Sequence, residues 1–165
     1  MTDRADVSLL FDLFVATQRI RRVLASAMEG SGMRADEYAV YSLLFEKGPL
    51  TATEMSRQLG LPLSTLLDYL KTMDRVGHLG RVPHPLDGRA ISVGLSSGGV
   101  AAQRRANASW EVARRAIEEA LPLPVGQVRV ALRALDDAAV AAQRSVPPGA
   151  PASQAGKSRH RRPRG

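Results

Sequence analysis

The chain has no cysteine among its 165 residues. It therefore has no disulfide bond, no zinc held by cysteine and no thiol redox switch. It also lacks an apolar run long enough to span a membrane, and Met1-Thr2-Asp3-Arg4 does not begin a signal peptide. These absences predict a cytoplasmic protein with no membrane partner.

Residues with catalytic or metal-binding spacing are also missing. His78 and His84 flank the first strand of an expected hairpin, with Asp87 nearby, but three loosely spaced ligands on a hairpin make a poor metal site. The pairs Glu118-Glu119 and Asp136-Asp137 are adjacent on expected helices and diverge, unlike paired catalytic carboxylates. We therefore expect no enzyme activity, no metal and no cofactor.

Acidic residues are absent from the end of the chain. From Pro147 onward the sequence is rich in Pro, Gly, Ala and Ser and then in basic residues, which predicts a disordered tail. The body holds 18 of the 23 basic residues and all 16 acidic ones, so it carries only +2 of the net charge of +7. Net charge is therefore weak support for a DNA-binding body, and the tail adds either sequence-independent attraction to phosphates or nothing beyond solvation. The basic residues of the tail are Lys157, Arg159, Arg161, Arg162 and Arg164.

Two short amphipathic helices are predicted between residues 51 and 76. Thr51 and Glu54 have the spacing of a capping box at a helix start, and Gly60 ends that helix. A second helix is predicted from Pro62 to Val76, because proline is tolerated where a helix begins. Its inward side is predicted to hold Leu66, Leu70, Met73 and Val76. The opposite, polar face holds Ser64, Asp68, Lys71, Thr72 and Arg75.

A two-stranded hairpin is predicted after these helices. Leu79, Arg81 and Val82 precede the turn Pro85-Leu86-Asp87-Gly88, and Ala90 to Leu95 alternates apolar and small residues as a half-buried strand does. Arg89 stands beside the tip, where a guanidinium can enter a narrow minor groove. Two helices, a strand, a turn and a strand in this order are typical of a winged helix-turn-helix that reads duplex DNA.

These residues resemble the MarR (multiple antibiotic resistance regulator) family of transcription factors. The resemblance runs from about Val7 to about Ala142. It is most specific through Leu59 to Thr65, Arg81, Pro85 to Arg89, and Val93 to Gly99. It implies that Asp87 holds Arg81 and that Arg89 is the wing-tip arginine in the minor groove.

The remaining segments predict helices from Val7 to Met28, Ala35 to Glu46, Val100 to Ala120, and Val125 to Arg144. The expected fold class is mainly α (α+β), a winged helix-turn-helix with a two-stranded β-wing and long terminal helices. The resemblance implies a domain of residues 1–145, with dimerisation helices at about 7–33 and 97–145 and the winged helix lobe at about 35–96. Residues 146–165 form the basic tail.

The resemblance implies a ligand-responsive regulator, usually a repressor, that binds a pseudo-palindromic operator in double-stranded DNA as a homodimer. The expected DNA-binding residues are Ser64, Thr65, Leu67, Asp68, Lys71, Thr72, Arg75, Arg81, Asp87 and Arg89. A small-molecule effector is expected between the dimerisation helices and the lobe, near Arg21, Tyr38, Tyr41 and Trp110, although packing roles compete with this for each of the four.

Two departures from the family pattern leave alternatives open. Gly88 stands where members often have a second arginine, and Asp68 stands where they commonly have a basic or polar residue. Phosphates repel a carboxylate, but Asp68 is able to accept a hydrogen bond from cytosine, or to pair with Thr72 or Lys71 along its own helix. The alternative function is a winged-helix protein-interaction module without sequence-specific DNA binding.

Overall fold

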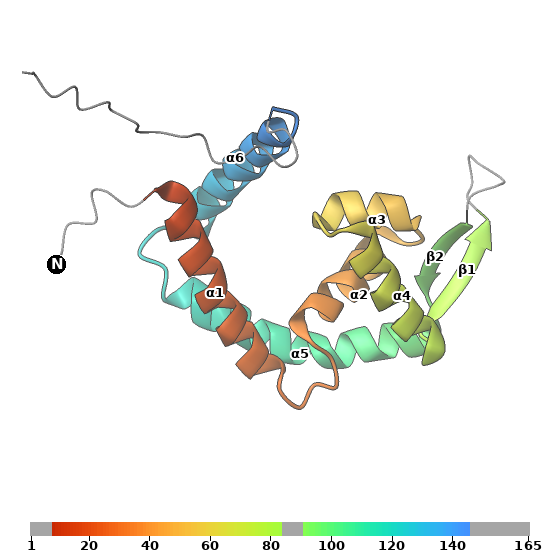
Figure 1. Cartoon of the computed structure of the whole chain (residues 1–165). Coiled ribbons are helices and arrows are strands. Elements are labelled where there is room, and N and C mark those ends of the chain that lie inside the picture. The colour runs from red at the N-terminus through yellow and green to blue at the C-terminus, as the bar shows by residue number, and fades with distance from the viewer. Residues whose placement is uncertain (1–7, 84–90, 146–165) are drawn as a thin grey trace, which may run out of the picture. The chain divides into compact units, whose positions relative to one another are not determined.

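Helices begin and end close to where the sequence predicts them. The computed structural model describes residues 8–83 and 91–145, and these form six helices and one two-stranded sheet (Figure 1). The chain divides into two units, residues 1–119 and 120–165. The first holds α1 (Leu9–Met28), α2 (Ala35–Lys47), α3 (Ala52–Leu59), α4 (Leu63–Arg75), β1 (Leu79–Pro83), β2 (Ile91–Leu95) and α5 (Ser97–Glu119), and the second holds α6 (Val125–Gln143). The predicted fold class, mainly α with a two-stranded wing, is confirmed.

The predicted capping box is present at the start of α3. The Thr51 hydroxyl accepts a hydrogen bond from the Glu54 backbone N–H at 3.3 Å, and the Glu54 carboxylate accepts one from the Thr51 N–H at 2.8 Å. Gly60 ends α3 with φ +63°, a left-handed conformation that favours glycine. α4 then starts one residue later than predicted, because Pro62 is its N-cap.

The wing is an antiparallel pair in which Leu79 faces Leu95 and Arg81 faces Val93. An isolated bridge between Leu50 and Val93 adds a short segment at the other edge of β2. Asp87 and Arg89 belong to the hairpin tip, residues 84–90, which lies outside the described residues.

Burial along β2 does not follow the predicted alternation, because Val93, Gly94 and Leu95 are all partly buried. Its fully buried side chain is the small one, Ser92, at 1% exposed, whereas Ile91 is 62% exposed. The larger apolar residues Val93 and Leu95 are only partly buried where they pack against the core.

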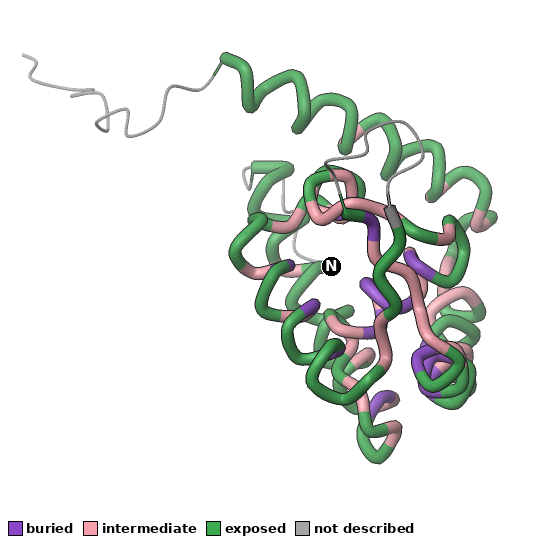
Figure 2. The backbone as a smooth tube through the Cα atoms, turned by 90° about the vertical axis from the view of Figure 1, so that its right-hand side faces the viewer, coloured by how far each residue is buried: buried purple, intermediate pink, exposed green. Residues whose placement is uncertain are grey.

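The main core lies where α2, α3 and α4 meet. Val40, Met55 and Leu66 are each fully buried there, and Ala102 of α5 closes the same cluster. Figure 2 shows buried positions gathered inside this unit, with exposed backbone around them. The inward side of α4 is therefore part of this core, and its opposite, polar side is exposed to solvent.

The prediction that Val76 points inward is wrong. Leu66, Leu70 and Met73 are buried as expected, but Val76 is 53% exposed. At 100° per residue, Val76 lies roughly a quarter turn away from the direction of the other three, and it is the C-cap of α4 rather than a helical residue. The apolar spacing alone does not distinguish a core position from the edge of the core face.

α5 begins at Ser97, three residues before the predicted Val100. Ser96 caps it, because its hydroxyl accepts from the Gly99 N–H at 3.2 Å. Gly99 packs so closely against the preceding loop that a Cβ there would lie 2.3 Å from the His78 carbonyl oxygen. Gly98 and Gly99 therefore lie in the first turn of α5, where they contact the segment that follows α4.

The terminal helices leave large apolar side chains uncovered within their own units. On α1, Leu10 is 74% and Phe14 is 60% exposed. In the second unit, α6 buries none of its residues, and Leu132 is 53% exposed. Large apolar side chains that gather on an exposed helix face are typical of a surface that binds a partner.

Candidate nucleic-acid interface

The outward face of α4 is polar and open to solvent. Ser64, Asp68, Lys71 and Arg75 are exposed along it, and Thr65 is half-buried. Within the described residues no side chain caps the start of α4, and its first turn has no acidic residue. The free N–H groups and the positive end of the helix dipole therefore remain available to an anion such as a phosphate.

Thr72 differs from its neighbours on this face. Its hydroxyl donates to the Asp68 backbone oxygen at 3.1 Å, so it bonds within its own helix. It also lines a cavity on the side of α4 away from the wing. The expected pairing of the Asp68 carboxylate with Thr72 or Lys71 is not present: among the described residues, that carboxylate has no hydrogen bond or ion pair.

An ion pair that the sequence analysis missed joins α4 to the wing. The Arg81 guanidinium donates to the Asp74 carboxylate at 2.8 Å. Arg81 lies on β1 and Asp74 in the last turn of α4, so the pair connects the two elements that would approach DNA. Sequence reasoning assigned Arg81 to Asp87, which lies outside the described residues. The available signal was an outward acid on α4 seven positions before an arginine.

A shallow groove separates the exposed polar face of α4 from the wing. It encloses about 350 Å³, and its lining includes Leu67, Lys71, Asp74, Arg81 and Ile91. Leu67 is 49% exposed there. This apolar side chain is therefore presented beside charged ones at the junction of helix and wing.

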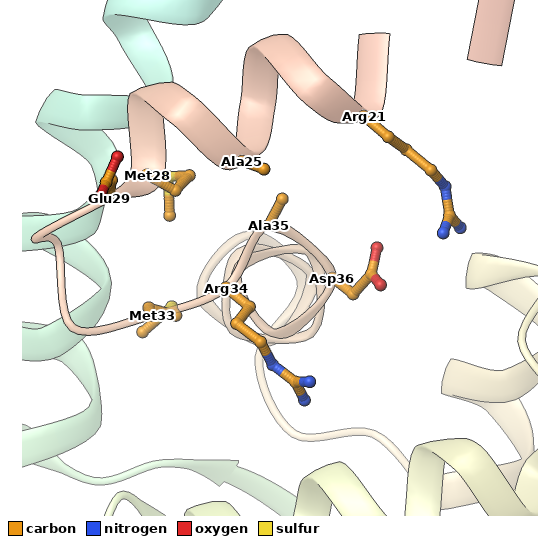
Figure 3. A pocket seen from close by; sticks show the side chains of 8 residues that line it. All are labelled: Arg21, Ala25, Met28, Glu29, Met33, Arg34, Ala35 and Asp36. Carbon is orange, nitrogen blue, oxygen red and sulfur yellow. The ribbon is translucent and has the colours of Figure 1, made fainter. Parts of the chain in front are cut away.

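The four residues expected around an effector lie at different places, because Arg21 and Tyr41 line two different cavities and Tyr38 stacks on Trp110. Arg21 borders a cavity of about 390 Å³ between α1 and the first turn of α2, together with Met28, Met33 and Asp36 (Figure 3). In Figure 3 the Arg21 and Asp36 side chains extend to the same side of the cavity.

Tyr38 and Trp110 pack against each other. Their rings stack with centroids 4.7 Å apart, and Tyr38 is buried with Met28 and Ala106. The Tyr38 hydroxyl donates to Asn107 Oδ1 at 2.6 Å. This hydrogen bond satisfies the polar end of a buried tyrosine, so in this arrangement the pair fills space between α2 and α5.

Tyr41 borders a larger cavity of about 520 Å³ behind α4, which Tyr69, Thr72 and Val76 of that helix also line. Its hydroxyl is hydrogen-bonded to His78 Nδ1 at 2.7 Å. Burial, reinforced by the nearby Glu37 charge, raises the pKa of the Tyr41 phenol above its usual value, so the group stays neutral. A molecule in this cavity would touch the rear of the recognition helix directly.

His78 connects three elements at this point. Its N–H donates to the Met73 carbonyl at 2.9 Å, and its carbonyl accepts from the Ser96 N–H at 3.0 Å. The residue was considered in the sequence only as a poor metal ligand. Among residues 8–83 and 91–145 no cluster of three or more metal-binding side chains occurs, and no helix is both long and apolar enough to cross a membrane.

Known proteins share this arrangement of helices and wing. No family model matches the chain. The uncharacterized HTH-type transcriptional regulator Mb0904 of Mycobacterium bovis is 27% identical over 115 residues, which cover 68% of this chain and 80% of that protein. The HTH-type transcriptional repressor YetL of Bacillus subtilis is 26% identical over 101 residues, 60% of each chain.

Solved structures agree over a longer span. A probable transcriptional regulator from Pseudomonas aeruginosa has 28% identity and a TM-score of 0.65, covering 80% of this chain and 96% of that one. A mutant of E. coli MarR complexed with operator DNA has 20% identity and a TM-score of 0.68, covering 77% and 92%. The chain therefore has the fold of the solved MarR structures. Another similar structure is the PcaV regulator from Streptomyces coelicolor with its natural ligand, at 22% identity and a TM-score of 0.63, covering 84% and 99%.

Three residues with clear structural roles escaped the sequence analysis. Asp74 holds Arg81, His78 holds Tyr41, and Gly99 allows α5 to approach the end of the helix-turn-helix. The spacing of seven residues was a signal for the Asp74–Arg81 pair, whereas the contact between Tyr41 and His78 spans 37 residues and that of Gly99 is a close backbone approach, neither of which residue spacing reports.

Proposed function

We propose that the chain is a ligand-responsive repressor that binds a pseudo-palindromic operator as a homodimer. The observation that carries this proposal is the exposed polar face of α4 beside a wing that the Arg81–Asp74 ion pair holds to it. The operator-bound relative of similar fold supports the same mode of binding.

In this proposal α4 enters the major groove and the wing tip the adjoining minor groove. Ser64, Thr65, Lys71 and Arg75 contact base edges and phosphates, and Leu67 meets a thymine methyl group. Arg89 enters the minor groove, while Arg81 and Asp87 position the hairpin. Replacing Arg89 by Ala should weaken operator binding by about 1 to 3 kcal/mol with fold and dimer unchanged. Wild-type affinity in that variant would rule out the wing contact.

The homodimer rests on the uncovered apolar faces of the terminal helices. A second copy would cover Leu10 and Phe14 and place two recognition helices roughly 34 Å apart, one turn of DNA. Sedimentation at micromolar concentration should show a dimer, and Phe14→Glu should dissociate it. Ala16→Glu adds the same charge at an exposed position on the opposite side of the same helix and should not. A wild-type monomer, or equal effects of the two variants, would contradict this interface.

The effector is proposed to bind in the cavity beside Tyr41. A ligand there contacts Tyr69 and Thr72 on the rear of α4, so its binding energy can favour one position of the recognition helix over another. A panel of phenols and aromatic carboxylates, scored by release of operator DNA, tests this. A releasing compound should lose its effect in a Thr72→Phe variant that still binds operator. Release unchanged in that variant would place the effector elsewhere.

A gel shift with the protein and its own upstream DNA separates the repressor from the alternative, a protein-interaction module. Sequence-dependent binding that weakens with salt supports the repressor. The near-neutral body and the acidic Asp68 on the recognition face favour the alternative. Absence of binding even at low salt would make the interaction module the better function.

A further inference from the structure

One carboxylate on the recognition face remains unneutralised. α4 carries two outward acids, and Asp74 is paired with Arg81 at 2.8 Å. Asp68 is exposed, and its carboxylate has no partner among the described residues, since the Thr72 hydroxyl donates to the Asp68 backbone oxygen instead. Asp68 therefore presents a full negative charge and two oxygens that only accept hydrogen bonds.

The position of Asp68 on α4 points it toward bases rather than toward the wing. Leu67 and Lys71 line the groove next to β2, but Asp68 does not. Ser64 precedes Asp68 by four residues, so the two lie one above the other on the open side of the helix. Asp68 is the sixth residue of α4, within the first two turns, from which recognition helices contact base edges.

A carboxylate at this position discriminates among bases by chemistry alone. In the major groove only the cytosine N4 and adenine N6 amino groups donate hydrogen bonds. Adenine places its N7 acceptor beside N6, and guanine offers two acceptors, so both oppose a carboxylate more than cytosine does. We propose that Asp68 is a specificity-determining residue that selects a C·G base pair, through cytosine N4, at one position in each operator half-site. This inference rests on the proposed function.

Basic side chains next to Asp68 on α4 can contact the guanine of the same base pair. When Asp68 accepts from cytosine, the guanine of the same pair presents O6 and N7 acceptors in the groove. Lys71 and Arg75 lie on the same outward face and carry the donors that guanine requires. Their charges also offset the repulsion between Asp68 and nearby phosphates.

Selection from a randomised duplex library with the full-length protein tests the inference. Wild type should enrich cytosine at one half-site position by about 5- to 150-fold over other bases, the range for one good base contact. Asp68→Ala should lose that preference alone. Asp68→Asn should shift it to adenine, because an amide both donates and accepts and so matches N6 and N7.

Glu119→Gln provides the matched control for charge. Glu119 is exposed at the last position of α5, roughly 33 Å along that helix from its start near α4. It should leave every base preference unchanged. If the Asp68 variants bind more tightly but select the wild-type motif, the carboxylate only repels phosphates and the inference is wrong. If wild type selects no motif, the proposed function fails with it.

Discussion

Gly98 and Gly99 are neighbours in the first turn of α5, but replacing each by alanine should affect the stability of the fold differently. At residue 99 an alanine Cβ would lie 2.3 Å from the His78 carbonyl oxygen, far inside van der Waals contact. At residue 98 the nearest heavy atom would be His78 Cδ2 at 3.5 Å, an ordinary contact. Both residues lie in the first turn of the same helix, so an alanine gains similar helix propensity at either position.

The magnitude follows from the difference between the two sites. Gly98→Ala should stabilise the fold by up to about 1 kcal/mol, because glycine loses more backbone entropy on folding. Gly99→Ala has the same gain but also an overpacking cost of about 1 to 3 kcal/mol. The His78 carbonyl cannot retreat freely, since it accepts the Ser96 N–H at 3.0 Å. The propensity gain cancels in the comparison, so the overpacking cost alone separates the variants.

Thermal unfolding of both variants at equal protein concentration measures this difference. At about 2 to 4 °C per kcal/mol, the Tm of Gly99→Ala should lie about 2 to 12 °C below that of Gly98→Ala. Operator binding should also weaken in Gly99→Ala alone, because His78 follows the recognition helix directly. Equal Tm values, or a higher Tm for Gly99→Ala, would refute the close contact between α5 and the loop.

Further predictions concern the wing, the buried phenol and the tail. Arg81→Ala should cost less than about 1 kcal/mol in stability, since its ion pair with Asp74 is exposed, but should weaken operator binding; a double-mutant cycle with Asp74→Asn should show coupling, and additive losses would contradict a shared role. The raised pKa of Tyr41 means that the unfolded chain releases this proton more readily, so stability should fall as pH rises above about 10. Tyr41→Phe should reduce this fall in stability when Tm is measured between pH 9 and 11. An unchanged dependence of Tm on pH would contradict a role of Tyr41 in it. Deleting residues 149–165 should lower nonspecific DNA affinity and its salt dependence while keeping operator preference; loss of preference would show that the tail reads bases.

Local signals in the sequence were sufficient to predict where the helices begin and end. Thr51 and Glu54 form the predicted capping box, Gly60 ends α3, and α6 begins directly after the predicted break at residues 121–124. Each signal acts within one helical turn, so no tertiary information is needed to interpret it. Most helix boundaries differ from the prediction by one or two residues; the largest difference is at α5, which begins at Ser97, where Ser96 caps the helix and Gly99 packs against His78.

The candidate site was predictable as a surface but not as a set of contacts. The sequence placed Ser64, Asp68, Lys71 and Arg75 on one outward face, and the structure exposes them all. It offered a pairing of Thr72 with the Asp68 carboxylate, whereas the Thr72 hydroxyl donates to the Asp68 backbone oxygen. Helical periodicity determines direction around an axis, whereas the choice of hydrogen-bond partner depends on which acceptors are near.

The amino-acid sequence by itself therefore determined the order of helices and strands, the fold class and the polar face of the recognition helix, because capping, turn chemistry and apolar period are local properties. Only the tertiary structure decided that Asp74 pairs with Arg81, that Tyr41 meets His78 across 37 residues, and that the Asp68 carboxylate has no partner among the described residues. Such pairings depend on distances between elements far apart along the chain, and those distances exist only once the apolar residues of α2, α3, α4 and α5 have packed into one core.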